Sequence, residues 1–108
     1  MSYKVETTED FNKEAKSLIK KYPSLKTELK ELYIELLENP SIGTPLGKNV
    51  FKIRLSIASK NKGKPGGAKV IIFIKIINET IYLLTIYNKG EKESISTKEI
   101  EELLKDYK

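Results

Sequence analysis

The side chains in this chain that could act on a negatively charged substrate are basic or phenolic. Lys52 and Arg54 alternate with apolar residues in one segment, Lys69 follows in the next, and Tyr87 and Lys89 stand close together further on. Lysine and arginine bind phosphate oxygens, and a phenol can transfer a proton or stack on a nucleobase. These residue types suit a polyanion such as RNA or DNA.

The positive charge is concentrated in the middle of the chain. No acidic residue occurs between Asn39 and Asn78, whereas eight cations do: Lys48, Lys52, Arg54, Lys60, Lys62, Lys64, Lys69 and Lys75. Charge segregated in this way produces a local positive field that attracts nucleic acid. A lysine-rich surface that only keeps the protein soluble is the alternative interpretation of the same pattern.

The composition excludes several kinds of chemistry. The chain has no cysteine and no histidine, so disulfides, thiolate sites and imidazole catalysis are excluded, and we expect no metal or other cofactor. The segment GKPGGAK resembles a phosphate-binding P-loop, but Ala68 stands where the motif requires glycine and Val70 where it requires serine or threonine. A nucleoside-triphosphate site is therefore not expected. No apolar run reaches the roughly 20 residues of a membrane span, and the N-terminus lacks a signal-peptide core. We expect one domain over residues 1–108, located in the cytoplasm without a membrane partner.

Helical spacing of apolar residues dominates the first part of the chain. Residues 2–6 could form a short strand, and Thr7 is the expected N-cap of a helix over residues 8–22. Ser24 can cap a second helix that ends at Asn39 before a proline. Because the turn between them is so short, the two helices should pack as an antiparallel hairpin. Residues 40–49 are glycine- and proline-containing, and the prediction there is a loop.

The pattern then changes to strands. Alternation over residues 51–57, an apolar run over 68–77 and a further run over 80–87 predict three strands, and Ser96 with Glu99 predicts the capping box of a final short helix. The expected order is β-α-α-β-β-β-α. The expected fold is α+β, an antiparallel sheet with the helical hairpin on one face and a short C-terminal helix.

The strand pattern predicts where the basic side chains lie. The apolar residues of segment 51–57 should face the hairpin, which places Lys52 and Arg54 on the opposite face. If Lys69 shares that face, a concave basic surface results, with Tyr87 at its rim. Further cations from the loop and from the segment after the last strand would extend it: Lys60, Lys62, Lys64, Lys89 and Lys92. Such a surface suits a bent single strand of RNA. Tyr87 could instead simply complete the core.

The runs FKIRLSIASKNKGKPGGAKVIIF and YLLTIYNKGEKESIS resemble the RelE/ParE superfamily of toxins from bacterial toxin–antitoxin modules, within it most closely the RelE and HigB branch. The resemblance extends over the helical hairpin and so covers nearly the whole chain. It implies a microbial-RNase-like fold and a ribosome-dependent endoribonuclease that cuts mRNA in the A site. It also implies an antitoxin that holds the toxin inactive in a hetero-oligomer, with mRNA and the ribosome as further partners.

The resemblance assigns roles to particular positions. Lys52 and Arg54 would bind and activate RNA, and Lys69 would stabilise the reacting phosphate where an arginine is usual. Lys89 and Lys92 match a cationic stretch of the family, and Lys48 joins the expected RNA-binding cations. The tyrosine that some members place near the C-terminal end falls at Ser96, for which Tyr87 is the candidate replacement.

The proton-transfer candidates are Lys52, Tyr87 and Lys89, and neighbouring cations are expected to lower their pKa values. Two other functions remain open from the sequence. A non-cleaving inhibitor that only binds RNA or the ribosome, or a degenerate toxin, is suggested by Lys69 and Ser96. A ParE-like inhibitor of DNA gyrase would share the fold.

Overall fold

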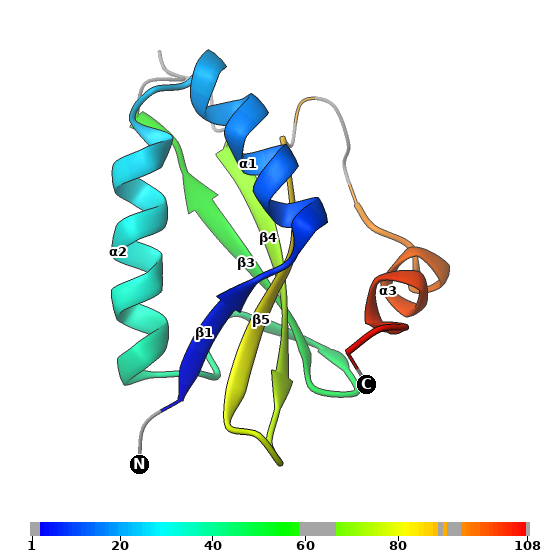
Figure 1. Ribbon diagram of the computed structural model, residues 1–108. Coiled ribbons are helices and arrows are strands. Elements are labelled where there is room, and N and C mark those ends of the chain that lie inside the picture. Colours follow the sequence, from blue (N-terminus) through cyan, green and yellow to red (C-terminus); the bar gives the residue numbers. More distant parts are fainter. Residues whose placement is uncertain (1–2, 59–66, 89, 91–93, 108) are drawn as a thin grey trace.

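The protein is described by a computed structural model that covers residues 3–58, 67–88, 90 and 94–107. A five-stranded sheet has the order β1-β5-β4-β3-β2 and separates two helical layers (Figure 1). Its strands are β1 (Lys4–Thr7), β2 (Thr44–Gly47), β3 (Val50–Ser56), β4 (Gly67–Lys75) and β5 (Thr80–Asn88). Helices α1 (Glu9–Lys21) and α2 (Leu25–Glu38) cover one face, and α3 (Thr97–Leu104) packs on the other. The predicted α+β fold with a helical hairpin on one face is confirmed.

The N-cap of α1 is one residue later than expected. Thr8, not Thr7, caps the helix, because its hydroxyl oxygen accepts from the Phe11 N–H at 3.1 Å. The same hydroxyl lies 3.2 Å from the Leu83 carbonyl and 3.0 Å from the Leu84 carbonyl, within donor distance of both. Thr8 therefore starts α1 and ties it to β5.

The sheet is mixed rather than purely antiparallel. β3, β4 and β5 pair antiparallel, whereas β1 runs parallel to β5, with Thr7 opposite Leu83. A parallel pair requires a long connection, and the helical hairpin is the first part of that crossover.

The predicted loop over residues 40–49 is wrong for Thr44–Gly47, which forms the edge strand β2 and pairs with β3. Pro45 has no N–H to donate and is tolerated there because β2 is an edge strand. Lys48 and Asn49 form the connecting turn with φ of 54° and 64°, the left-handed conformation that a tight hairpin turn needs. The expected element order therefore gains one strand.

Two apolar clusters form on opposite faces of the sheet. The larger joins α1 and α2 to residues such as Ile53, Val70, Ile72 and Ile86. The smaller lies under α3 and contains Val50, Ile71, Phe73, Leu84, Tyr87 and Leu104. The apolar side of segment 51–57 faces the hairpin as predicted. The face that carries Lys52 and Arg54 is partly covered by α3.

Candidate functional site

The strand register places three of the predicted site residues in one row across the sheet. Arg54 of β3 is directly opposite Lys69 of β4, and Lys69 is directly opposite Tyr87 of β5. Directly paired residues project to the same face and are near neighbours. Arg54, Lys69 and Tyr87 therefore form a continuous row, called the basic row below, on the face opposite the helical hairpin. Lys52 lies two residue pairs along β3 from Arg54, opposite Ile71, and therefore projects to the same face.

The members of the basic row differ in exposure. Arg54 is exposed and Lys52 is half-buried, so both can meet a substrate without rearrangement. Lys69 and Tyr87 are each only 8% exposed. The expected tyrosine at the rim is therefore wrong in this structure, because Tyr87 packs in the apolar cluster beneath α3.

A small cavity joins Lys52 to Tyr87. It has a volume of about 160 Å³, and its lining includes Leu46 of β2 and the residues around the start of α3, among them Ile95, Thr97 and Ile100. Tyr87 and Lys52 both line this cavity, although the Tyr87 hydroxyl itself is buried.

The start of α3 is held in place over this cavity by a capping box. The Ser96 hydroxyl accepts from the Glu99 N–H at 3.1 Å, and the Ser96 N–H donates to Glu99 Oε1 at 3.0 Å. The predicted capping box is thus confirmed, and it fixes the Glu99 carboxylate at the end of the helix nearest the cavity.

Burial, with a smaller contribution from the Glu99 carboxylate, raises the pKa of Tyr87 above its ordinary value of 10.0. We had expected neighbouring cations to lower it. That expectation is wrong for Tyr87, because removing the phenolate from water disfavours the charged form. The phenol of Tyr87 is therefore protonated at neutral pH.

The remaining predicted cations are only partly placed. Lys48 lies in the turn after β2, and its ammonium group is 3.7 Å from Glu101 Oε2 of α3 in an exposed ion pair. Five other predicted site residues lie outside the described residues: Lys60, Lys62, Lys64, Lys89 and Lys92.

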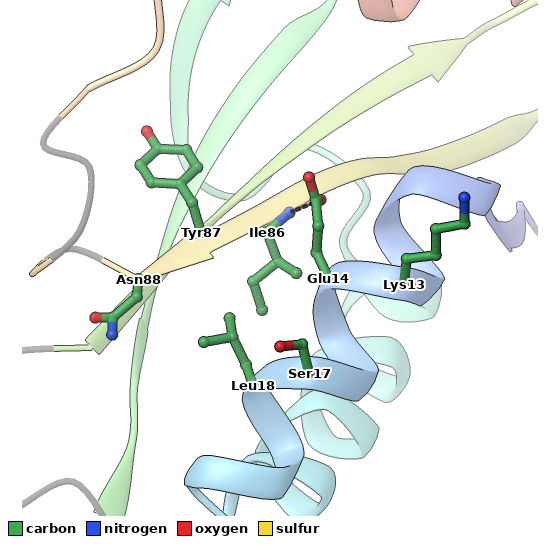
Figure 2. Close-up of a pocket in the computed structure, with 7 residues that line it drawn as sticks. All are labelled: Lys13, Glu14, Ser17, Leu18, Ile86, Tyr87 and Asn88. Carbon is green, nitrogen blue, oxygen red and sulfur yellow. Dashed lines mark hydrogen bonds between the residues drawn. The ribbon is translucent and has the colours of Figure 1, made fainter.

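A second hollow lies on the other side of Tyr87, between α1 and β5 (Figure 2). Glu14 of α1 reaches β5 there, and its Oε1 accepts from the Thr85 hydroxyl at 2.6 Å and from the Ile86 N–H at 3.2 Å. Sequence reasoning identified neither Glu14 nor Glu99 as a site residue, because each is one of many charged residues on an amphipathic helix. No periodicity marks which of them reaches a distant strand.

Within the described ranges there is no group of three or more carboxylates that could hold a metal ion. Over the same residues no helix is long and apolar enough to cross a membrane.

A sequence model of the RelE toxin of the RelE/RelB toxin–antitoxin system matches residues 3–107. The chain belongs to the RelE toxin family. The resemblance inferred from the strand and loop motifs is thereby confirmed.

Solved structures of other bacterial toxins have a similar fold. A double mutant of the E. coli toxin RelE in the free state matches with a TM-score of 0.67 and 19% identity, covering 100% of both chains. The intact E. coli RelBE toxin–antitoxin complex matches with a TM-score of 0.58 and 18% identity, over 78% of this chain and 93% of that chain. A metal-bound toxin from Helicobacter pylori matches with a TM-score of 0.50 and 22% identity, over 83% of this chain and 98% of that chain.

One departure of this RelE-family chain now has a structural explanation. Ser96, at the position where some RelE toxins are expected to have a tyrosine, is the N-cap of α3 and uses its hydroxyl there. Tyr87, the candidate replacement, ends β5 next to Lys69. The phenol thus reaches this face from the sheet rather than from the C-terminal segment.

Proposed function

We propose that this RelE-family toxin is a ribosome-dependent, metal-independent endoribonuclease that cuts mRNA and so inhibits translation. The observation that carries the proposal is the basic row, in which Arg54, Lys69 and Tyr87 are directly opposed on three adjacent strands. Two cations and a proton donor side by side are the groups that metal-free RNA cleavage requires.

The proposed reaction is attack of the ribose 2′-oxygen on the adjacent phosphorus. Arg54 and Lys69 would bind the phosphate oxygens as negative charge develops in the pentacovalent transition state. Tyr87 would donate its proton to the departing 5′-oxygen, which suits a phenol whose pKa is raised by burial. The products are a 2′,3′-cyclic phosphate and a 5′-hydroxyl end.

Two lysines are candidates to accept the 2′-hydroxyl proton. Lys52 shares the small cavity with Tyr87, and Lys89 follows β5 but lies outside the described residues. Since the substrate must enter a site partly covered by α3, orientation of the mRNA by the ribosome would contribute much of the rate.

We further propose that a cognate antitoxin holds this toxin inactive in the cell. Support comes from the family to which the chain belongs and from the similar fold of the toxin–antitoxin complex of E. coli RelBE. An antitoxin segment with acidic and apolar residues would suit the cationic face or the helices.

The test is primer-extension mapping of mRNA on programmed ribosomes with the wild type, Arg54→Ala and Lys69→Ala. New 5′ ends in the A-site codon are expected for the wild type, with cleavage reduced about 10²–10³-fold in either variant. Lys30→Ala, an exposed cation on α2, is the matched control and should cleave at the wild-type rate. Equal cleavage by all four proteins would contradict the assignment.

A non-cleaving inhibitor that occupies RNA or the ribosome is the second candidate. Two observations favour it: a lysine at position 69 cannot form the bidentate contact of an arginine, and Tyr87 is buried. Translation blocked without new mRNA ends would establish this function instead.

A further inference from the structure

The hollow between α1 and β5 exists because β1 is shorter than β5. β1 pairs with β5 only as far as Leu83, whereas β5 continues to Asn88. α1 runs beside the remaining edge and leaves a groove of about 390 Å³. Figure 2 shows Lys13, Glu14, Ser17 and Leu18 of α1 along the groove, opposite Ile86, Tyr87 and Asn88 of β5.

The groove has an apolar floor and one fixed anionic acceptor. Leu18 and Ile86 are buried and form the floor, and Tyr87 of the basic row also lines the groove although its ring points away from α1 (Figure 2). Two hydrogen bonds hold the Glu14 carboxylate in place, because its Oε1 accepts from the Thr85 hydroxyl and the Ile86 N–H. Its other carboxylate oxygen points away from Ile86 (Figure 2).

These features select a flat ligand with N–H groups at its edge. The carboxylate of Glu14 disfavours a phosphate, whereas a nucleobase can lie over apolar side chains and donate to an acceptor. Lys13 is exposed at the groove and can contact the phosphate that such a base carries with it.

We propose that the groove is a nucleobase subsite that takes a base next to the cleaved phosphate and prefers bases with an exocyclic amino group. This inference rests on the proposed endoribonuclease function, because Tyr87 joins the groove to the basic row. Adenine, cytosine and guanine present an amino group to Glu14. Uracil presents one N–H between two carbonyl oxygens, which the carboxylate repels.

The first test measures cleavage of mRNAs on programmed ribosomes. In these mRNAs the base on either side of the cleaved bond is varied, one position at a time, through all four bases. The wild type should cleave about tenfold more slowly with uracil at one of these positions, the cost of losing one hydrogen bond to a charged acceptor. Glu14→Gln keeps an oxygen for Thr85 and Ile86 but turns an NH₂ group outward, so the discrimination against uracil should be lost or reversed. Glu38→Gln, an exposed glutamate of α2, is the matched control and should keep the wild-type preference.

The second test does not depend on cleavage. Amide NMR signals of Ile86 and Asn88 in the ¹⁵N-labelled toxin are followed during titration with cytidine or uridine monophosphate. Cytidine monophosphate should shift both signals more strongly than uridine monophosphate, and Glu14→Gln should abolish the difference. Equal or absent shifts, or an unchanged base preference in a cleaving Glu14→Gln protein, would overturn the subsite alone. Absence of cleavage by the wild type with the cytidine-specific shifts intact would overturn the endoribonuclease but keep the base site.

Discussion

At the scale of single residues, Tyr87 shows how burial sets the acid–base role of a side chain. Its phenol lies among apolar residues beneath α3, with Glu99 as the nearby charge that raises its pKa further and Lys52 sharing its cavity. Lys69 is its neighbour on β4, and Glu14 lines the same groove as Tyr87. Burial and Glu99 together favour the protonated phenol, which suits the proposed role of Tyr87 as a proton donor.

The raised pKa of Tyr87 predicts a loss of stability at alkaline pH. The folded state binds the phenolic proton more tightly than the unfolded state, whose tyrosine has a pKa near 10.0. Stability is therefore fully present below pH 10 and falls as the pH rises through the folded-state pKa. Urea unfolding between pH 8 and pH 11 should show this fall, and Tyr87→Phe should show a smaller one. An identical pH dependence in the two proteins would contradict the shift.

At the scale of elements, α3 depends on its N-cap to cover the site. Ser96→Ala removes the hydroxyl that accepts from the Glu99 N–H, and loss of such a cap costs about 1 kcal/mol. We expect faster amide hydrogen exchange over α3 and a lower urea midpoint. Ser94→Ala is the matched control, because Ser94 lines the cavity without capping the helix. Equal effects of the two substitutions would show that the cap does not hold α3.

The helical hairpin depends in the same way on Thr8. Thr8→Ala removes both the N-cap of α1 and the contacts of the hydroxyl with the Leu83 and Leu84 carbonyls. We expect the free energy of unfolding to fall by about 1–2 kcal/mol. Thr7→Ala, one residue earlier and exposed in β1, should change it by less than about 0.5 kcal/mol. Denaturant unfolding of the two variants measures the difference, and the reverse order would place the cap at Thr7.

At the scale of the whole molecule, positive and negative charge lie in different parts of the sequence. The middle carries cations and no acidic residue, whereas all acidic residues lie toward the two ends. Most of the central cations lie on β3 and β4 and in the segment between them, whereas α2 and α3 carry several exposed glutamates. If the protein acts on RNA as proposed, this arrangement would orient it during approach with the basic row leading.

This charge separation predicts that RNA binding falls steeply with salt. For about four phosphate contacts the slope of log K against log salt should be roughly −3. Arg54→Ala should reduce the slope by about 0.7, and Lys30→Ala should leave it unchanged. Fluorescence anisotropy with a labelled single-stranded RNA measures both. A slope near zero for the wild type would contradict an electrostatic interface.

The sequence by itself determined most of the elements and which basic residues share a face of the sheet. The sequence pattern placed the two hairpin helices, four of the five strands and the Ser96 cap within a few residues, because the same side chains that form the core also set the period. The charge pattern identified Lys52, Arg54 and Lys69, because alternation in a strand fixes which side chains share a face. The edge strand β2 was missed because Pro45 and its neighbouring glycines are typical of a loop, and only pairing with β3 makes them a strand.

Only the tertiary structure decided the register and the burial. Pairing between β3, β4 and β5 brings Arg54, Lys69 and Tyr87 together, and residues 15 or more positions apart carry no local signal of their partners. The same holds for α3, whose apolar side covers Tyr87 and reverses the expected direction of its pKa shift. It also holds for Glu14, which meets β5 because β1 ends early. Desolvation and contact between distant segments follow from packing in three dimensions, so sequence spacing cannot supply them.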